Sequence, residues 1–418
     1  MSVPVLFKDK TFLPLFITQW IGAFNDNVLK SAFTFLVAYG GLSLAGLSSD
    51  AALLIGAAVY VAPFMLASGL SGALSDRFEK VTIIRRTRLA EIVLALVAGL
   101  ALLSQSVPLL LICLFAYSTQ SAFFGPAKYS ILPEVLREDQ LIEANAWLES
   151  STFMATLFGL LFGGFLAGNG HIGFIAGTLF ALAAISYAVA RMIPPVGIAE
   201  TGEPVDLNPV STSITAVKTV FAKIRLFRSA VGLAWFWSVG LVVLTVFPDV
   251  AKSQLNVSAN VANVLIASFV VGIAMGTAAV SRMLKGVISA RHVPIGALGM
   301  AIFLIDLAAA TNAYGAAYPN LADTGFATFI SSWEGMHVVL DMVAIAAFGG
   351  VFTVPLYAIL QAQSEDDARS TAIAGSNIIS AAMMVVVTLV ATLLMAAGIS
   401  VSGVLVVLGI VNIGVAIY

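Results

Sequence analysis

The chain has 418 residues, of which 60% are hydrophobic and 10% are charged, and its formal net charge is −2. A soluble domain carries about 25% charged residues, so this composition excludes a soluble globular protein, and the small net charge gives no reason to expect a nucleic-acid partner. Apolar runs of about 20 residues, each long enough to cross the hydrocarbon layer as a helix, recur along nearly the whole chain. The sequence therefore predicts an all-α, polytopic membrane protein.

Twelve apolar runs predict twelve transmembrane helices, at 11–38, 51–74, 86–104, 107–126, 144–168, 171–191, 229–250, 259–281, 293–312, 336–361, 371–397 and 400–418. The longest connector, 192–228, contains several prolines and then a basic amphipathic stretch, which predicts a linker. It separates an N-terminal six-helix bundle, 1–191, from a C-terminal six-helix bundle, 229–418. Two such halves are typical of transporters that bind substrate near the membrane midplane.

The basic residues of the connectors predict the orientation of the chain. All Lys and Arg residues except Lys30 and Lys252 lie in alternate connectors or at their edges. The positive-inside rule places these connectors in the cytoplasm. We therefore expect a cytoplasmic N-terminus and a cytoplasmic linker.

The first predicted span contains a polar cluster, Asn25-Asp26-Asn27, followed by Lys30. Gln19, Gly22, Asp26 and Lys30 fall within about 80° of one helical face. An acid at mid-bilayer costs about 3 kcal/mol on insertion scales, and Asp26 and Lys30, four residues apart, are expected to pair. Two interpretations follow: a neutralised pair that orients helices, or a polar stripe that lines a substrate cavity. The second interpretation makes Asn25, Asp26, Asn27 and Lys30 candidate substrate-binding residues.

A second polar stripe runs along the fifth predicted span, where its members share one helical face: Asn145, Glu149, Thr152, Thr156, Gly159 and Gly163. This stripe is predicted either to contact substrate or to form a packing seam, because small residues four apart allow close helix approach. In the packing interpretation, the side chain of Glu149 would reach the cytoplasmic edge of the membrane. Asn377 opens the eleventh span much as Asn145 opens the fifth, so we include both, with Glu149, among the candidate substrate-binding residues.

Two further acids, Asp306 and Asp341, lie within the ninth and tenth predicted spans and are candidates for binding a proton or a cation. Glu91, three residues after Arg88, is expected instead to form a local ion pair with it at the inner edge of the third span. The three histidines, His171, His292 and His337, lie at predicted span edges, and no metal-ligand or nucleophile–base spacing is present. We therefore expect no catalytic site, no metal site and no cofactor in this chain.

The connector "GALSDRFEK" (72–80) resembles the loop signature of the major facilitator superfamily, Gly-x-x-x-Asp-Arg/Lys-x-Gly-Arg/Lys. Gly72, Asp76, Arg77 and Lys80 match this signature, and Glu79 replaces its second glycine. The resemblance implies a major facilitator superfamily fold of twelve helices. It also implies a conformational latch at these four residues, in which Gly72 permits close helix approach and Asp76 binds a helix N-terminus or a basic partner.

Three stretches resemble the bacterial lysophospholipid transporter family: "QWIGAFNDNVLKSAF" (19–33), "YVAPFMLASGLSGALSDRFEK" (60–80) and "FFGPAKYSILPEVLREDQLIEANAWLES" (123–150). The resemblance implies transport of lysophospholipids, chiefly lysophosphatidylethanolamine, from the outer to the inner leaflet of the bacterial inner membrane for reacylation. It also implies that Asp26, Asn27, Lys128 and Tyr129 bind substrate. The headgroup amine suits Asp26, and the phosphate suits Lys30 or Lys128.

The amino-acid sequence of the first span also resembles transporter modules fused to a phospholipid acyltransferase and an acyl-acyl-carrier-protein synthetase. This resemblance implies such enzymes as partners, fused or separate, and the end of the sequence at Tyr418, inside the last predicted span, leads us to expect a longer parent protein. A proton-coupled exporter of amphiphilic drugs with the same fold is the alternative function. A third hypothesis is a membrane anchor for a fused enzyme, although a pure anchor would not need a buried acid such as Asp26.

Overall fold

The computed structural model describes residues 5–38, 42, 49–197, 206–257, 259–318 and 325–417, and the structural statements below concern these residues. Tyr418 and residues 198–205 of the predicted linker lie outside them. Each of the twelve predicted spans coincides with a long helix or with a pair of helices in series.

The first six predicted spans correspond to α1 (Phe12–Ala38), the pair α2 (Ser49–Leu66) and α3 (Ser68–Arg77), α4 (Lys80–Leu103), α5 (Val107–Ser130), α7 (Leu141–Gly168) and α8 (Ile172–Ala190). Pro63 lies inside α2 and has no N–H to donate, and the chain breaks soon after it, at Ala67 between α2 and α3. Two short 3-10 helices (Val5–Lys8 and Glu138–Gln140) and α6 (Leu132–Val135) lie in the connectors.

The last six predicted spans correspond to α10 (Ile224–Ser253), α11 (Ala259–Leu284), α12 (Val293–Ala317), α14 (Trp333–Gln363), α15 (Arg369–Ala396) and α16 (Val401–Ile417). The short helices α9 (Pro209–Phe221) and α13 (Phe326–Ser331) lie in connectors. Nine helical stretches of the described part are both long and apolar enough to cross a membrane. Of the remaining long helices, α16 is apolar with 17 residues, whereas α1 and α4 carry buried charged residues.

The surface of α4 shows what surrounds these helices. Its exposed large hydrophobic side chains recur every three or four residues and so form one stripe: Leu89, Val93, Leu96, Leu100 and Leu103. A continuous apolar stripe of this kind is unfavourable in water and is suited to lipid.

Contacts divide the chain into two compact units. The first contains Met1–Gln140, Ser151–Phe227 and Leu360–Ala381, and the second contains Leu141–Ser150, Arg228–Ile359 and Ala382–Tyr418. The two six-helix bundles expected from the sequence are a different division, and they remain a prediction.

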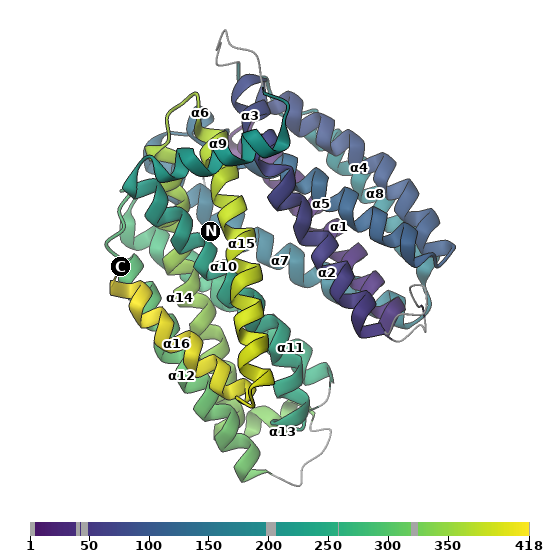
Figure 1. Ribbon diagram of the computed structural model, residues 1–418, viewed down its shortest axis with the longest axis vertical. Coiled ribbons are helices and arrows are strands. Elements are labelled where there is room, and N and C mark those ends of the chain that lie inside the picture. Colours follow the sequence, from purple (N-terminus) through teal and green to yellow (C-terminus); the bar gives the residue numbers. More distant parts are fainter. Residues whose placement is uncertain are drawn as a thin grey trace. The chain divides into compact units, whose positions relative to one another are not determined.

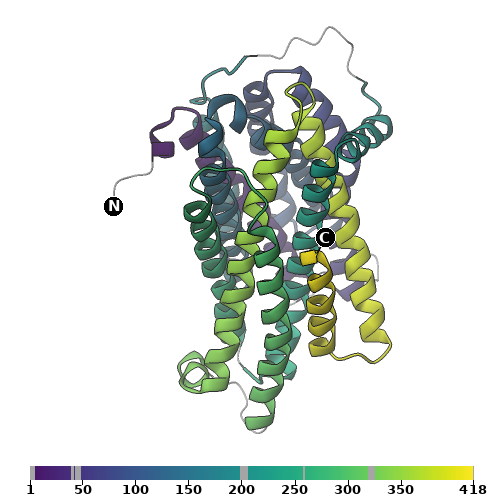
Figure 2. The same ribbon diagram turned by 90° about the vertical axis from the view of Figure 1, so that its left-hand side faces the viewer.

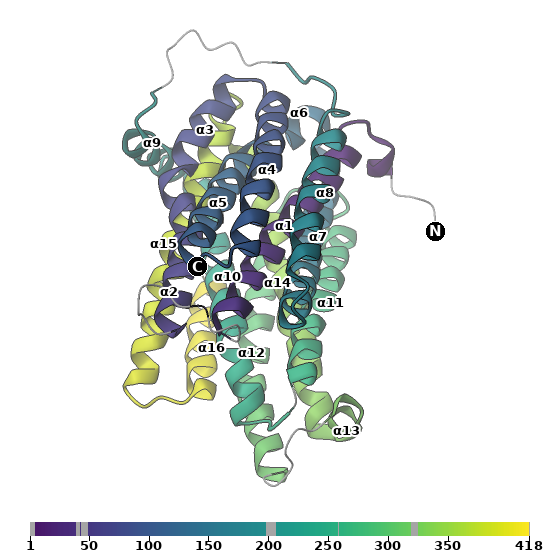
Figure 3. The same ribbon diagram turned by 90° about the vertical axis from the view of Figure 1, so that its right-hand side faces the viewer.

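In the first unit, α4 packs against α5 and α8, and α1 packs against α8 and α5 (Figure 1 and Figure 3). The core between these helices is built mainly of Leu, Ala, Val and Ile, with Tyr117 of α5 fully buried among them. This packing places one face of α1 against α4 and α8 and another face against α5.

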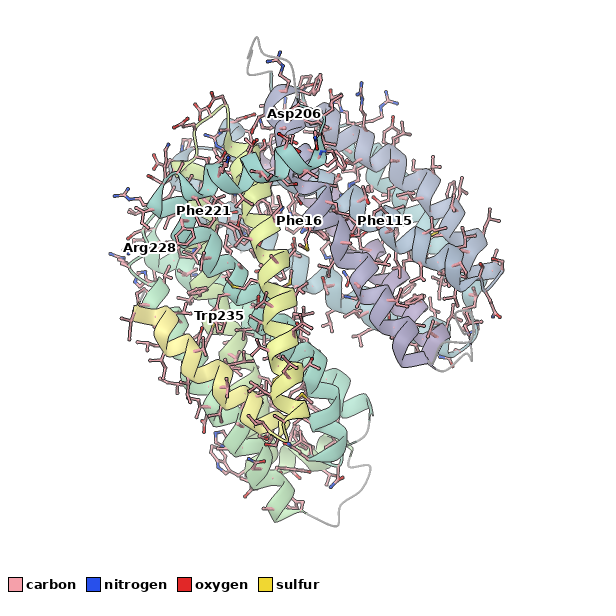
Figure 4. All side chains as sticks on the ribbon, viewed as in Figure 1. Phe16, Phe115, Asp206, Phe221, Arg228 and Trp235 are labelled. Carbon is pink, nitrogen blue, oxygen red and sulfur yellow. The ribbon has the colours of Figure 1, made fainter. Side chains whose placement is uncertain are left out.

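In the second unit, α12 packs against α16, which forms a hairpin with the end of α15 (Figure 2). Asn412, in the middle of α16, joins two neighbours, because its Oδ1 accepts from Trp235 Nε1 at 2.5 Å and its Nδ2 donates to the Ala297 carbonyl at 2.7 Å. Trp235 lies on α10 (Figure 4). This buried amide therefore connects α16 to both α10 and α12.

Helix α9 forms within the part of the linker that the sequence predicted to be amphipathic. Asn208 caps it by accepting from the Val210 N–H at 3.0 Å. The helix packs against α3, its buried residues include Ala216, and Phe221 at its C-terminal end is exposed. Figure 4 shows Asp206, which precedes the helix, and Phe221 at its two ends.

Candidate functional site

The three polar residues in the middle of α1 face three different neighbours. Successive residues of a helix are about 100° apart, so Asn25, Asp26 and Asn27 point in different directions. Asn25 Nδ2 donates to Glu91 Oε1 of α4 at 3.1 Å and lies 3.2 Å from the Leu179 carbonyl of α8. Asn27 Nδ2 donates to Thr156 Oγ1 of α7 at 3.2 Å. These two amides therefore fix α1 against its neighbours.

Asp26, between them, faces α5. Ser121 Oγ donates a hydrogen bond to its Oδ2, and the side chain is 6% exposed. Its other oxygen, Oδ1, accepts no hydrogen bond from the part of the chain that the structure describes. Asp26 therefore has an acceptor oxygen available for a cationic group.

The predicted pair between Asp26 and Lys30 is wrong. Lys30 Nζ instead lies 5.2 Å from the centre of the Tyr60 ring on α2, in a cation–π contact. The ion pairs of the described residues do not include Asp26 with Lys30. The shared helical face permitted the pair, but Ser121 and Tyr60 on other helices determine where the two side chains point.

Behind Asp26 lies a buried polar network that the sequence did not predict. The ion pair expected between Arg88 and Glu91 of α4 is confirmed, with Nη1 and Oε2 2.5 Å apart, but both residues are buried inside the protein and do not lie at its edge. Gln120 Nε2, next to Ser121, lies 3.4 Å from Glu91 Oε2. Gly22 makes room for this network, because a Cβ there would lie 2.7 Å from Arg88 Cζ.

The polar stripe of α7 forms a packing seam with α1 from Ser151 onward, within the first unit. Gln19 Nε2 donates to Thr152 Oγ1 at 2.5 Å. Added methyl groups would collide with α1 at two glycines, since a Cβ at Gly159 would lie 2.6 Å from the Phe24 carbonyl and one at Gly163 would lie 3.0 Å from Val28 Cα. This part of the stripe therefore holds helices together, as the packing interpretation predicted.

One face of α5 carries the remaining candidates of the first unit. Ser121, Gly125 and Lys128 lie within about 60° of each other on α5. A Cβ at Gly125 would lie 3.5 Å from Asn377 Nδ2, so Asn377 of α15 lies against this face. Lys128 Nζ lies 4.2 Å from the centre of the Tyr129 ring, and both side chains are buried. The structure thus brings Asp26, Asn377 and Lys128 to successive levels of one helical face.

The predicted contact between Asp76 and a helix N-terminus is present. Asp76 Oδ1 accepts from the Ser370 N–H at 2.7 Å, and Oδ2 accepts from the Thr371 N–H at 2.8 Å, in the first turn of α15. Two backbone N–H groups and the positive end of the helix dipole favour the carboxylate here. Gly72 permits the approach, because its Cβ would lie 2.7 Å from that of Ala374.

The other two residues of the motif lie around this contact. Lys80 Nζ is 2.6 Å from Glu134 Oε1 of α6, and Arg77 ends α3 as a half-buried side chain.

The connector that leads into α15 also contacts the end of the linker, where Lys223 Nζ is 2.8 Å from Glu365 Oε1. This hydrogen bond from Lys223 lowers the pKa of the Glu365 carboxyl.

Asn145 and Glu149 belong to the second unit and are both buried. Asn145 Nδ2 donates to the Leu141 carbonyl of its own helix at 2.8 Å. Their role as substrate-binding residues remains a prediction. The expectation that Glu149 reaches the membrane edge is wrong, since the side chain is 1% exposed.

The second unit also contains a cluster of one histidine and two acids that was not predicted from the sequence. His337, treated above as a span-edge residue, lies on α14 with Nε2 3.1 Å from Asp306 Oδ2 on α12 and 3.7 Å from Asp341 Oδ2. The signal was present in the sequence, because His337 and Asp341 are four residues apart and share a helical face. What brings Asp306 to them is the contact between two helices, which no local spacing reveals.

Comparison with known proteins identifies the family. A model of the Major Facilitator Superfamily matches residues 15–324. The chain belongs to the Major Facilitator Superfamily. It is therefore a multi-pass membrane transporter, and the loop signature at 72–80 and the twelve-helix fold expected from it are confirmed.

Relatives within the superfamily carry a more specific name. The chain is 28% identical over 364 residues to the lysophospholipid transporter LplT of Cronobacter sakazakii, covering 84% of this chain and 80% of the relative. It is 26% identical over 375 residues to LplT of Pectobacterium carotovorum, covering 86% of this chain and 80% of the relative. The resemblance seen in the sequence is thus confirmed along most of the chain.

Solved structures share the superfamily fold. The human organic anion transporter MFSD10 has a TM-score of 0.72 at 12% identity, over 97% of this chain and 99% of that one. The fucose:proton symporter FucP of E. coli has a TM-score of 0.69 at 10% identity, over 97% of each chain. At such low identity these likenesses support the fold alone.

Proposed function

We propose that this Major Facilitator Superfamily protein moves lysophospholipids, chiefly lysophosphatidylethanolamine, from the outer to the inner leaflet of the bacterial inner membrane by alternating access. The observation that carries the proposal is the similarity over 84% of the chain to a protein named for lysophospholipid transport. In the cell, the transported lipid would be reacylated by an acyltransferase and an acyl-acyl-carrier-protein synthetase, fused to this chain or separate from it.

The face between α1 and α5 suits the headgroup of this lipid. The amine would bind Asp26, whose Oδ1 accepts no hydrogen bond from the described residues. The phosphate would bind a lysine, because a charge-assisted hydrogen bond to phosphate is among the stronger polar contacts. Two lysines could bind the phosphate. At a helical rise of 1.5 Å per residue, Lys30 lies about 6 Å from Asp26 along α1, and Lys128 lies about 10 Å from Ser121 along α5.

The two lysines lie on opposite sides of Asp26 along the membrane normal if consecutive spans alternate in direction. With the N-terminus in the cytoplasm, as the basic connectors favour, Lys30 lies toward the outer leaflet and Lys128 toward the inner one. A lipid that keeps its amine near Asp26 would then exchange Lys30 for Lys128 as it crosses. This order of contacts agrees with uptake toward the cytoplasm.

Asp76 would control the cytoplasmic side of the transport cycle. The predicted halves, 1–191 and 229–418, are joined at this point by the hydrogen bonds from α15 to Asp76. A rocking motion that opens the cytoplasmic side must break these bonds. The sequence motif of Gly72, Asp76, Arg77 and Lys80 would then act as the latch that the superfamily resemblance implies.

Uptake by purified protein in proteoliposomes tests the proposal. We expect uptake of monoacyl glycerophospholipids in preference to diacyl ones, and stronger competition by lysophosphatidylethanolamine than by a lysolipid without a headgroup amine. Asp26→Ala should reduce this difference more than Asp306→Ala, which changes an acid in the second unit. Equal competition by all lysolipids would remove the role of Asp26 in amine binding, and competition only by planar cationic drugs would support an exporter instead.

A further inference from the structure

The cluster of Asp306, His337 and Asp341 combines three groups that ligate metals. One ligand atom from each residue can be chosen so that all three lie within 4.8 Å of one another. The imidazole is central, with Nε2 3.1 Å from Asp306 Oδ2 and 3.7 Å from Asp341 Oδ2. Two helices contribute, α12 with Asp306 and α14 with the other two.

Asp341 indicates that this is more than a surface ion pair. Its side chain is 1% exposed, and its Oδ2, which points at His337, accepts no hydrogen bond from the described residues. A carboxylate inside a membrane protein needs a counter-charge or hydrogen-bond donors, because its desolvation is costly. At Oδ2 the hydrogen bonds of the described residues leave this need unmet.

The charges of the cluster favour a divalent cation. Two carboxylates carry two negative charges, and one imidazolium would neutralise only one of them. A divalent ion bound to a neutral imidazole and two carboxylates gives a net charge of zero. Imidazole also selects the class of ion, since it suits zinc and other first-row transition metals, whereas magnesium and calcium prefer oxygen ligands.

The two distances from His337 fit a small ion with tetrahedral coordination. Bonds from Zn²⁺ to histidine nitrogen and carboxylate oxygen are about 2.0–2.2 Å long, which places neighbouring ligand atoms of a tetrahedron about 3.4 Å apart. The observed separations of 3.1 and 3.7 Å lie on either side of this value. The side chains of Asp306 and His337 are 41% and 31% exposed, so protein atoms leave room beside the cluster for a fourth ligand such as water.

Trp333 lies one turn before His337 on α14. Its ring stacks on the imidazole, with 5.7 Å between ring centres and 26° between planes. This contact restricts rotation of the imidazole, whose Nε2 lies near both carboxylates. We propose that Asp306, His337 and Asp341 form a binding site for a divalent transition-metal ion. Such an ion would join α12 to α14 within the second unit and neutralise the buried carboxylate of Asp341.

Cobalt titration of the purified full chain in detergent, with any polyhistidine tag removed, tests this site. Co²⁺ in a tetrahedral nitrogen and oxygen environment absorbs visible light, so we expect saturable absorption at one equivalent that Zn²⁺ abolishes by displacement. His337→Gln and Asp341→Asn should remove the absorption and weaken Zn²⁺ binding in calorimetry at least about tenfold, as loss of a ligand does. His171→Gln and His292→Gln are the matched controls and should retain both signals.

Either of two results would overturn the proposal. Absence of saturable Co²⁺ absorption, or Zn²⁺ affinity that is unchanged in the His337→Gln and Asp341→Asn variants, would show that no metal site exists here. Asp306→Asn changes an exposed side chain and provides a third variant if Asp341→Asn fails to fold. Since the readout is metal binding, the result does not depend on which lipid the protein transports.

Discussion

Asp26 of α1 accepts its hydrogen bond from Ser121 of α5, a residue 95 positions later in the chain, and not from Lys30 on the next turn of its own helix. This contact orients the buried carboxylate toward α5 and leaves Oδ1 without a donor from the described residues. The chemistry of the site thus depends on a neutral hydroxyl that holds an acid, with the lysines at a distance from it.

Ser121→Ala should weaken both stability and headgroup selection. Loss of the donor leaves a buried carboxylate with an unmet acceptor, which costs about 1–3 kcal/mol. We therefore expect a lower midpoint of thermal unfolding and a smaller preference for the amine-bearing lysolipid, with a smaller loss than Asp26→Asn causes. Thr119→Ala is the control, because that hydroxyl donates to the Phe115 carbonyl of its own helix at 2.7 Å. Wild-type selectivity in Ser121→Ala would contradict the positioning role.

Asp76→Ala should impair transport more than folding. It removes the cap of α15, worth about 0.5–2 kcal/mol, and a change of 1–2 kcal/mol in the balance of two conformations alters their ratio about 5–30-fold. Uptake rates and thermal unfolding of the same preparations separate the two effects. Asp366→Ala serves as control, since that carboxylate is exposed and pairs with Arg369. Equal uptake by both variants would argue against a latch at Asp76.

Breaking the Arg88–Glu91 pair should destabilise the protein strongly. Glu91→Gln leaves the buried guanidinium without a counter-charge, and loss of one partner of a buried pair costs about 3–5 kcal/mol. We expect a low yield of folded protein and a reduced unfolding midpoint in detergent. The double change Arg88→Met with Glu91→Met removes both charges and should recover part of the loss. A Glu91→Gln variant as stable as the wild type would show that the network is dispensable.

The sequence predicted the helices well because each needs only local information. A run of about 20 apolar residues can satisfy its backbone in a membrane only as a helix, and the polar motif around Asp76 identified a helix cap. The partners of Asn25, Asp26 and Asn27 were not predictable, since periodicity tells which residues share a face but not which helix lies opposite. For the same reason Ser121 carried no signal, and Arg88 with Glu91 was placed at the membrane edge instead of in the core.

Orientation in the membrane follows from the basic connectors and can be measured with single cysteines. In a Cys113→Ala background, a cysteine at Asp206 should react with a membrane-impermeant reagent only from the cytoplasmic side. A cysteine at Ala317 should react only from the outside. Both positions are exposed in the structure, so access to the reagent is not limited by burial. Labelling of both from one side would overturn the predicted topology of these two positions.

Lys30 provides a test of the site that separates structure from transport. Its ammonium lies over the Tyr60 ring, a contact worth about 0.5–2 kcal/mol, and forms no ion pair with Asp26. Lys30→Ala should therefore reduce the folded yield only slightly, and Asp26→Asn added to it should not raise that yield. Transport should fall in both variants, because the phosphate loses one partner in the first and the amine also loses its partner in the second.

Yield by fluorescence-detected size exclusion and uptake in proteoliposomes measure the two properties, with Tyr60→Phe, which keeps the aromatic ring, as the control. If Lys30→Ala abolished folding and the double change restored it, the two charges would have to neutralise each other in the folded protein. Full transport by the double variant would show that neither residue binds the headgroup.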